Sequence, residues 1–197
     1  MSQRSLNVRS IDLVGLTKRY IHPGELDVIA ALLVIVQAEV VVEIGVNEGR
    51  TAKAMLRNVP SISRYIGIDV LPGYQFGCKV QENEIPLEPG HLAMDDPRFE
   101  LVLRNQGSLG LDPEVLRAEV GERGVCAVFV DGDHSAHAVL LDSALASVVV
   151  KPGGITIWHD YHNLGTVDVK DVLEEFYRRG RKIFHVEKTW IAFEWQK

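Results

Sequence analysis

The chain has 197 residues, 46% of them hydrophobic and 24% charged, which is ordinary for a soluble globular protein and predicts one domain over residues 1–197. Its formal net charge of −6 argues against a nucleic-acid partner, because nucleic-acid-binding domains usually carry a basic excess. No apolar run reaches the ~18 residues of a membrane span, no signal-peptide layout opens the chain and no C-x-x-C motif is present, so we expect a cytoplasmic protein without a membrane partner.

Residues 1–38 are expected to form a helical cap that packs on a sheet. A short helix is predicted for Ile11–Tyr20. Apolar residues then recur at helical spacing and predict a second helix over Glu25–Gln37. This cap could line a substrate site, and plain core packing is an equally good interpretation.

Val40–Ile44 is an almost continuous apolar run, typical of a parallel strand that is covered on both faces. Gly45 permits a sharp exit from this strand, because glycine has no Cβ to clash at positive φ. Gly49 permits close approach of a ligand or of the next helix, which is predicted to run from Gly49 to Asn58. The amides that open this helix would face the crevice where nucleotide-like ligands bind in open α/β sheets.

This turn does not match the dinucleotide pattern G-x-G-x-x-G, which would need glycine at the positions of Asn47 and Arg50. The pattern is instead E-x-G-x-x-x-G, with Glu43 inside the end of the strand. An acid there would repel a pyrophosphate but suits a ligand with an ammonium group. S-adenosylmethionine carries an ammonium, a sulfonium and no phosphate, so the turn favours it over a nicotinamide cofactor.

The second strand, Tyr65–Asp69, ends in an acid that is placed to accept hydrogen bonds from ribose hydroxyls. Residues 71–97 follow, with four prolines, three glycines and no sustained periodicity. A loop of this length in a compact domain is usually functional or disordered. We therefore predict an insertion at 71–97. It could be a lid over the site or a surface loop without a function, and the sequence favours neither interpretation.

The rest of the chain alternates strands and helices, which predicts a doubly wound α/β fold with a mostly parallel sheet of seven strands. The further predicted strands are 99–103, 125–130, 155–158, 183–186 and 190–195. One helix is predicted to begin at Asp112-Pro113, a second to run along Ala138, Leu141, Leu145 and Val148, and a third to cover Val169–Tyr177. Lys151–Gly154 is predicted to be a turn.

The first, fourth and fifth strands should lie together at the centre of the sheet. Their carboxyl ends would then bring several polar residues and a glycine to one crevice, namely Glu43, Gly45, Asp131, His134, His159 and Asp160.

Four motifs carry a family resemblance. Glu43-Ile44-Gly45 with Gly49, followed by Asp69, resembles motifs I and II of class I S-adenosylmethionine-dependent methyltransferases. The segments Phe129–Ser135 and Pro152–Tyr161 resemble one branch, which includes macrocin-type sugar O-methyltransferases and cephalosporin-hydroxylase-like proteins. The resemblance covers residues 38–195 and implies a Rossmann-like sheet with an antiparallel last strand and N-terminal helices packed on it.

The resemblance also implies site roles. The residues expected to contact the cofactor are Glu43, Gly45, Val46, Asn47, Gly49, Thr51, Asp69, Val70, Gly107, Ser108, Asp131 and His134, with Gly107 and Ser108 near the adenine. Members of the branch often use a divalent cation, magnesium above all, and its expected ligands here are Asp131, His159 and Asp160. His159 stands where such enzymes commonly carry another acid, so it could instead bind manganese, iron or zinc, or act as a base without metal.

The catalytic candidates are His134, His159 and Asp160, with contact to the adenine edge as the second interpretation of His134. The leading hypothesis is O-methylation of a hydroxylated small molecule such as a sugar or a phenol, and a homodimer is the default for this branch. A nicotinamide-dependent oxidoreductase and a non-catalytic binder of S-adenosylmethionine are the alternatives.

Overall fold

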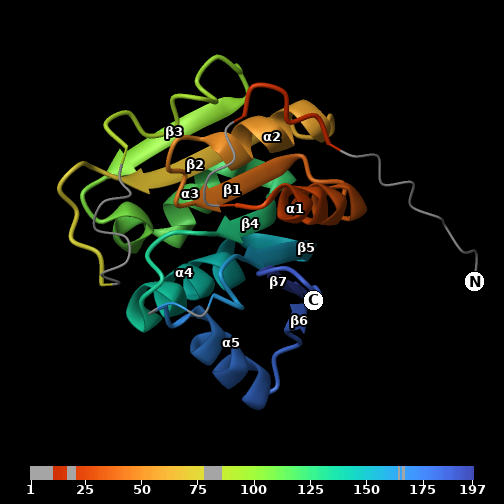
Figure 1. Ribbon diagram of the computed structural model, residues 1–197, viewed down its shortest axis with the longest axis vertical. Coiled ribbons are helices and arrows are strands. Elements are labelled where there is room, and N and C mark those ends of the chain that lie inside the picture. Colours follow the sequence, from red (N-terminus) through yellow and green to blue (C-terminus); the bar gives the residue numbers. More distant parts are fainter. Residues whose placement is uncertain (1–10, 17–20, 78–85, 164, 166) are drawn as a thin grey trace, which may run out of the picture.

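A computed structural model of the chain describes residues 11–16, 21–77, 86–163, 165 and 167–197. Its elements in chain order are α1 (Pro23–Ile35), β1 (Val40–Ile44), α2 (Arg50–Asn58), β2 (Arg64–Val70), β3 (Phe99–Arg104), the 3₁₀ helix η2 (Gly107–Gly110), α3 (Pro113–Val120), the 3₁₀ helix η3 (Gly121–Arg123), β4 (Val125–Val130), α4 (Ala136–Val149), β5 (Val150–Trp158), α5 (Val169–Arg178), β6 (Phe184–His185) and β7 (Ala192–Trp195) (Figure 1). None of the helices in this part of the chain is long and apolar enough to cross a membrane.

The strands form one seven-stranded sheet in the order β3-β2-β1-β4-β5-β7-β6. The pairs from β3 to β5 are parallel, whereas β7 is antiparallel to both of its neighbours. The predicted mostly parallel sheet with an antiparallel last strand is therefore confirmed. From β1 the chain builds the sheet outward through β2 and β3 and then returns to add β4 on the other side. The strand order thus reverses between β1 and β4, which is where ligands bind in open α/β sheets.

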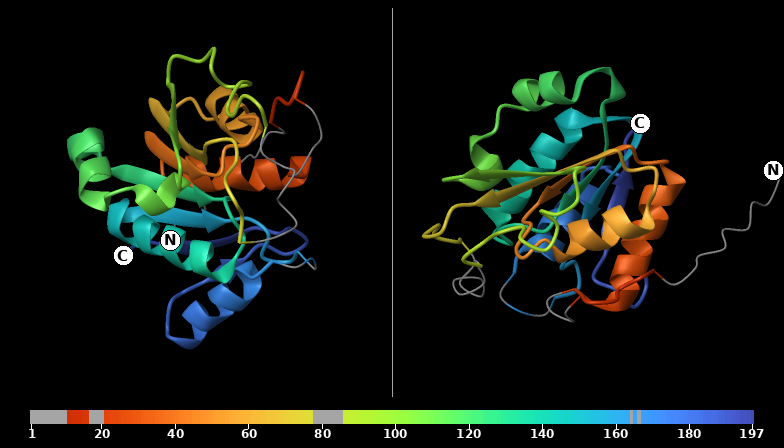
Figure 2. Two further views of the ribbon diagram at one scale, coloured as in Figure 1. Left: turned by 90° about the vertical axis from the view of Figure 1, so that its left-hand side faces the viewer. Right: turned by 90° about the horizontal axis from the view of Figure 1, so that it is seen from above.

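Helices cover both faces of the sheet (Figure 2). Helices α1 and α2 share one buried cluster with Val41, Tyr65 and Phe129, whereas α3, α4 and α5 share another with Val42 and Ile44. Successive residues of β1 thus point to opposite faces, and all five are buried. Apolar side chains are needed at every position of such a strand, which explains its continuous apolar run.

The predicted turn at Lys151–Gly154 is wrong, because β5 already begins at Val150. Pairing on both sides keeps these residues in the sheet: Val150 pairs with Val125, and Gln196 exchanges hydrogen bonds with Gly153 and Gly154 at 3.0 and 2.9 Å. A Cβ on Gly154 would lie 2.6 Å from the Cys126 carbonyl oxygen, so glycine lets the two strands approach closely here. Pro152, Gly153 and Gly154 are residue types that often form turns, but here they lie within β5.

The predicted helix Ile11–Tyr20 is not present in residues 11–16, and residues 17–20 lie outside the described part of the chain. The amides of Ile11 and Asp12 donate instead to the side chains of Asp27 and Asn58, at 3.2 and 2.7 Å. Side chains of α1 and α2 thus satisfy backbone groups that a helix would have paired internally.

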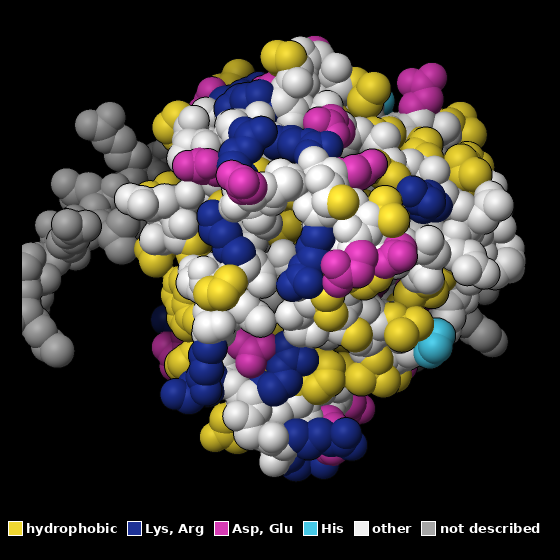
Figure 3. All heavy atoms as spheres, turned by 180° about the vertical axis from the view of Figure 1, so that it is seen from behind, with side chains coloured by type: hydrophobic (Ala, Val, Ile, Leu, Met, Phe, Trp, Pro, Cys, Tyr) yellow, Lys and Arg dark blue, Asp and Glu magenta, His cyan; other side chains and the backbone are white. Residues whose placement is uncertain are grey.

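The face behind the view of Figure 1 carries basic and acidic side chains that alternate across the surface (Figure 3). At the end of α5, the exposed side chains of Arg178 and Arg179 both pair with Glu175. Because two exposed arginines share one carboxylate, these ion pairs contribute little to stability.

Candidate functional site

The turn between β1 and α2 depends on backbone conformations that glycine adopts most readily. Gly45 and Gly49 both have a φ of 86°, and Asn47 between them has a φ of 50°. A Cβ on Gly45 would lie 2.2 Å from the Asp131 carbonyl oxygen, so any side chain there would push β1 away from the residues after β4. Glycine at position 45 therefore lets the two central strands end in contact.

Gly49 is approached by another part of the chain. A Cβ on Gly49 would lie 2.8 Å from the Gly90 carbonyl oxygen. The amides of Gly90 and Leu92 donate to the carbonyl oxygens of Asn47 and Glu48 at 2.7 and 2.9 Å. The second half of the 71–97 insertion is thus fastened to the glycine turn, and the close approach that glycine permits here serves this contact.

Asp69, at the carboxyl end of β2, holds the same turn by its side chain. Its Oδ2 accepts hydrogen bonds from the amides of Val46 and Asn47 at 2.9 and 2.7 Å, and its Oδ1 accepts one from Val70 at 2.7 Å. Burial raises the pKa of Asp69 and these hydrogen bonds oppose that rise. A carboxylate offers about four acceptor positions, so after three hydrogen bonds one remains for a ribose hydroxyl. The sequence predicted that Asp69 would bind a ribose, but not that its side chain would hold the turn by accepting hydrogen bonds from backbone amides.

Glu43 is a buried acid directly below the turn, with 1% of its surface exposed. Burial raises its pKa well above the usual range, and the nearby Asp131 adds to the rise, whereas a hydrogen bond with Tyr65 lowers it. Within the described residues, no group donates a hydrogen bond to its Oε2. A desolvated acceptor of this kind is suited to a cationic group that arrives with a ligand.

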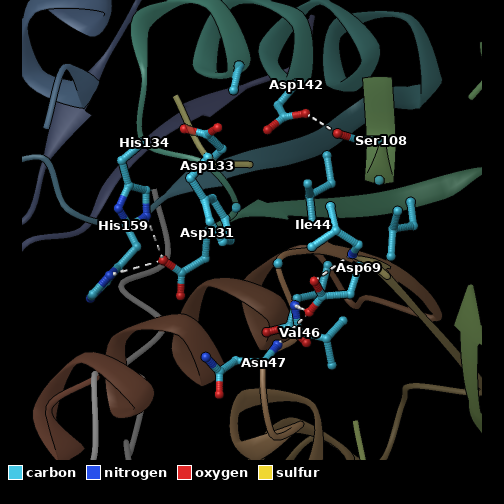
Figure 4. A pocket seen from close by; sticks show the side chains of 18 of the residues that line it. Ile44, Val46, Asn47, Asp69, Ser108, Asp131, Asp133, His134, Asp142 and His159 are labelled. Carbon is cyan, nitrogen blue, oxygen red and sulfur yellow. Dashed lines mark hydrogen bonds and ion pairs between the residues drawn. The ribbon is translucent and has the colours of Figure 1, made fainter. Parts of the chain in front are cut away.

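Asp131, His134 and His159 lie close together in Figure 4, and with Asp160 they form one charged cluster at the ends of β4 and β5. His134 Nε2 lies 3.5 Å from Asp131 Oδ1 and 3.2 Å from Asp160 Oδ2. His159 Nδ1 lies 2.9 Å from Asp160 Oδ2 and 3.3 Å from Asp131 Oδ1. These four residues therefore lie together, as the sequence predicted. Each of the two carboxylates lies near both imidazoles.

The electrostatics of the cluster favour charged imidazoles. Burial alone would lower the pKa of both histidines, but the neighbouring carboxylates raise it, and for His159 well above the usual range. Burial likewise opposes ionisation of Asp160, but its hydrogen bond with His159 and the charge of His134 lower its pKa to about 2. Asp160 is therefore ionised at neutral pH and faces both imidazoles.

Glu25 completes the cluster from α1 and was not predicted. Its Oε2 lies 3.2 Å from His159 Nε2 and accepts a hydrogen bond from the His22 amide at 3.0 Å, while its Oε1 accepts one from the Trp190 amide at 2.7 Å. Both ring nitrogens of His159 thus face carboxylates. An acid in the first turn of a helix is common for reasons of local stability, so nothing in the local sequence indicates this role.

Asp142 is a second residue that sequence reasoning missed. It lies on α4 with 2% of its surface exposed, and its Oδ1 accepts a short hydrogen bond from the Ser108 hydroxyl of η2. Burial raises its pKa to about 7 against the effect of this bond, and Asp133 adds to the rise. The predicted apolar face of this helix was partly wrong: Leu141 and Val148 are exposed, whereas Ala138, Asp142 and Leu145 are buried. An acid at i+4 and i−3 from buried positions is the signal that could have revealed it.

The first half of the insertion reaches the loop after β4. The Gly77 amide donates to Asp133 Oδ2 at 2.7 Å, and the Tyr74 hydroxyl donates to the same oxygen at 3.4 Å. Tyr74 and Phe76 both line the pocket. Residues 78–85 lie outside the described part of the chain, so lid closure stays a prediction.

One continuous pocket contains these features. Of the residues predicted to contact a cofactor, a metal or the reacting groups, those that line it are Glu43, Gly45, Val46, Asn47, Thr51, Asp69, Val70, Gly107, Ser108, Asp131, His134, His159 and Asp160. Gly49 does not line it. Tyr161 and His162 pack against His185, at ring-centroid distances of 4.9 and 4.6 Å. Trp190 lines the pocket beside His159.

Among the residues that the structure describes, Asp131, His134 and Asp160 could share a metal ion, because one ligand atom of each lies within 4.8 Å of the others. The two carboxylates suit magnesium or manganese, whereas the imidazole favours a metal such as iron or zinc. The donor set therefore fits a divalent cation, with His134 in the place that had been given to His159, and its imidazole counts against magnesium.

Comparison with known proteins gives a consistent family. The family model described as "Methyltransferase domain" matches residues 42–161. No curated protein matches the chain in sequence. Among solved structures, a candidate caffeoyl-CoA O-methyltransferase from Staphylococcus aureus is similar over 90% of this chain and 85% of its own, with 15% identity and a TM-score of 0.63.

Two further similar structures were determined with a bound ligand. An O-methyltransferase from Bacillus cereus in complex with SAH aligns over 92% of this chain and 84% of its own, with 16% identity and a TM-score of 0.56. The O-methyltransferase TomG from Streptomyces achromogenes in complex with SAM, involved in tomaymycin synthesis, aligns over 90% and 82%, with 13% identity and a TM-score of 0.56. At these identities the similarity shows a shared fold.

Proposed function

The chain belongs to the methyltransferase domain family, and on that premise we propose that it transfers the methyl group of S-adenosylmethionine to a hydroxyl oxygen of a small molecule. One observation carries the proposal: a single pocket contains both the glycine turn with Asp69 and the Asp131–His134–Asp160 cluster. A methyl donor and a proton acceptor can therefore be held in contact with the same substrate atom. The more specific likeness to the macrocin-type branch stays a prediction.

The turn half of the pocket is suited to the cofactor. Glu43 offers an unpaired buried oxygen to the ammonium group, and Asp69 has one acceptor position left for a ribose hydroxyl. When bound, S-adenosylmethionine supplies an electrophilic methyl group on a sulfonium and leaves as the neutral thioether. Its positive charges would lie among Glu43, Asp131 and Asp160, so the acidic pocket complements the ligand.

The cluster half of the pocket is suited to proton removal. As the acceptor oxygen forms its bond to the methyl carbon, its proton passes to His134 Nε2, and Asp131 and Asp160 on either side stabilise the imidazolium. His159 is a poorer base, because both of its nitrogens already face carboxylates. We assign His159 the role of a fixed positive charge that orients Asp131 and Asp160.

The same ligand atoms would hold a divalent cation if one is used. It would be bound by Asp131, His134 and Asp160 and would lower the pKa of the acceptor hydroxyl. Removal of metal distinguishes the two arrangements. If His134 acts as the base, turnover persists in EDTA and rises with pH as His134 loses its proton; if a cation is required, EDTA abolishes turnover and magnesium or manganese restores it.

The test begins with calorimetric titration of the protein with S-adenosylmethionine, S-adenosylhomocysteine and NADH. We expect micromolar binding of the first two and none of NADH. Transfer of a labelled methyl group is then assayed over a panel of phenols and sugars. Binding of NADH alone would overturn the proposal in favour of an oxidoreductase. Binding of S-adenosylhomocysteine without transfer to any hydroxyl would favour a non-catalytic binding protein.

A further inference from the structure

Asn163 lies in the loop after β5 and lines the pocket next to the cluster. Its Nδ2 donates a hydrogen bond to Asp160 Oδ1 at 2.7 Å, and its Oδ1 accepts one from the Gly165 amide at 2.9 Å. One end of the side-chain amide is thus bound to the loop, and the other end is bound to a carboxylate of the cluster. Asn163 therefore connects the conformation of this loop to the charged groups in the pocket.

The two oxygens of the Asp160 carboxylate have different surroundings. Its Oδ2 lies 3.2 Å from His134 Nε2 and 2.9 Å from His159 Nδ1, whereas its Oδ1 accepts the hydrogen bond from Asn163. The torsion that rotates an aspartate carboxylate has a broad energy profile, so the side chain alone does not fix the plane of the group. The hydrogen bond at Oδ1 therefore fixes this plane and keeps Oδ2 directed at both imidazoles.

The backbone of Asp160 has a conformation that neighbouring contacts must hold. Its φ of 58° lies in the left-handed region, which few residues other than glycine adopt. The Asn163 amide donates to the Asp160 carbonyl oxygen at 3.1 Å and closes a turn that begins at this residue. Strained residues of this kind cluster at functional sites and persist only where the surrounding structure determines them. The backbone and the side chain of Asn163 thus both act on Asp160.

We propose that Asn163 is a positioning residue for methyl transfer: by donating to Asp160 Oδ1, it directs Asp160 Oδ2 at His134 and so sets the orientation in which this imidazole receives the proton of the acceptor. This inference rests on the proposed function, since it concerns the cluster that is assigned to proton removal. Asn163 touches none of the reacting atoms in this assignment and acts only through Asp160.

A purely structural role for Asn163 makes a different prediction. The side chain could serve the loop alone, through the hydrogen bond from the Gly165 amide. Asn163→Asp separates the two roles, because the introduced carboxylate keeps an acceptor for that amide but has no donor for Asp160. Asn163→Ala removes both hydrogen bonds and introduces no charge. A positioning role thus requires both variants to be impaired, whereas a role in the loop alone leaves Asn163→Asp unaffected.

The experiment measures labelled-methyl transfer by the wild-type protein and both variants, with an acceptor found in the panel of phenols and sugars. We expect each variant to lower kcat by about 10- to 100-fold, because misplacing a reacting group by about 1 Å can cost about 10²-fold in rate. The KM for the acceptor and the Kd for S-adenosylhomocysteine should change by less than about threefold, because the lost interaction acts on the transition state.

Asn58→Asp is the matched control. The Asn58 Nδ2 donates to the carbonyl oxygens of Ala54 and Asp12 at 2.8 and 3.1 Å, and among the described residues it is not part of the pocket lining. This variant breaks hydrogen bonds of the same kind at the end of α2. It should therefore lower the Tm but keep the wild-type kcat.

A second measurement needs no acceptor. NMR spectra that correlate ¹H and ¹⁵N in the histidine side chains report the hydrogen bonds of each ring, and His134→Gln and His159→Gln identify the two signals of the cluster. We expect Asn163→Ala, which adds no charge, to shift the signals of both rings. Asn58→Asp should leave them unchanged.

The outcomes separate this inference from the proposed function. If Asn163→Asp keeps the wild-type kcat, the side chain serves only the loop and the assignment is overturned. If Asn163→Ala keeps the wild-type kcat or leaves both histidine signals unchanged, the assignment is overturned as well, while methyl transfer by the wild-type protein stands. If the wild-type protein transfers no methyl group to any hydroxyl, the proposed function falls and this inference with it.

Discussion

The two halves of the pocket are built in different ways. The half at the glycine turn is made of backbone: Gly45, Asn47 and Gly49 have positive φ angles, and Asp69 fixes the turn by binding its amides. The half at the cluster is made of charged side chains from α1 and the ends of β4 and β5. A backbone site tolerates almost no change at its glycines, whereas a side-chain site can lose its chemistry while its shape survives.

The largest expected effect breaks the backbone half. Gly45→Ala would place a Cβ 2.2 Å from the Asp131 carbonyl oxygen, and backbone atoms on both sides cannot yield. We expect a loss of stability of about 4 kcal/mol or more and no measurable binding of S-adenosylhomocysteine. Thermal unfolding and calorimetric titration measure the two effects.

Gly180→Ala is the matched control. Gly180 has a φ of 93° and nothing within 4 Å of its added Cβ, so it carries the backbone strain without the clash. It should cost about 1 kcal/mol and leave binding unchanged. Equal effects of the two variants would mean that strain, and not contact between β1 and β4, makes position 45 sensitive.

The second prediction breaks the cluster half alone. Asp160→Ala removes a carboxylate that lies 3.2 Å from His134 and 2.9 Å from His159 but touches no part of the glycine turn. We expect methyl transfer to fall by about 10²–10⁴-fold while the Kd for S-adenosylhomocysteine changes little. Labelled-methyl transfer and titration measure both quantities. Asp160→Asn, which keeps the shape, should be almost as inactive; normal turnover of either variant would place the chemistry elsewhere.

The contrast also explains what the sequence could predict. Residues such as Gly45 and Asp69 stand at strand ends that the apolar runs identify, so the sheet and the position of the glycine turn followed from local pattern. Glu25 is 134 residues away from His159, and its acid has an ordinary local use in a helix start. Gly153 and Gly154 look like a turn but are held in β5 by neighbouring strands. The errors thus arise where tertiary contacts decide the role of a residue.

The third prediction concerns Glu25→Gln, which takes one charge from the cluster. Burial opposes ionisation of Glu25, but its hydrogen bond with His159 lowers its pKa from 4.5, and the neighbouring carboxylates raise the pKa of His159 well above 6.5. Glu25 stabilises the folded protein fully above pH 4.5, and this contribution is lost as the pH falls through the lowered pKa of Glu25. His159 stabilises the folded protein fully below pH 6.5, and this contribution is lost as the pH rises through the raised pKa of His159.

The pair therefore contributes fully between pH 4.5 and 6.5, the two usual pKa values. We expect Glu25→Gln to lose about 3 kcal/mol of stability in this window and less on either side. Urea unfolding over a pH series measures this. Glu174→Gln, at an exposed position on α5, is the control and should show no such window. A difference that does not vary with pH would show that Glu25 acts by its hydrogen bonds to the His22 and Trp190 amides.

The fourth prediction weakens the cofactor half without a steric clash. Asp69→Ala removes three hydrogen bonds from backbone amides and the acceptor for the ribose. We expect the Kd for S-adenosylhomocysteine to rise by about 10- to 100-fold, because hydrogen bonds to a charged group contribute about 1.5–3 kcal/mol. At saturating cofactor, methyl transfer should recover most of its rate. A rate that stays low at saturation would mean that Asp69 also positions the reacting groups.

The smallest expected effect tests how the insertion is attached to the pocket. Gly77 binds Asp133 through its amide at 2.7 Å, whereas the Tyr74 hydroxyl approaches the same oxygen at 3.4 Å. Tyr74→Phe removes only the longer contact and keeps the ring that lines the pocket and packs against Phe76. We expect less than about a threefold change in the Kd for S-adenosylhomocysteine. Tyr74→Ala, which also removes the ring, should weaken binding further. If Tyr74→Phe alone matched that larger loss, the hydroxyl would be the anchor, and the backbone would hold the insertion less firmly than it holds the glycine turn.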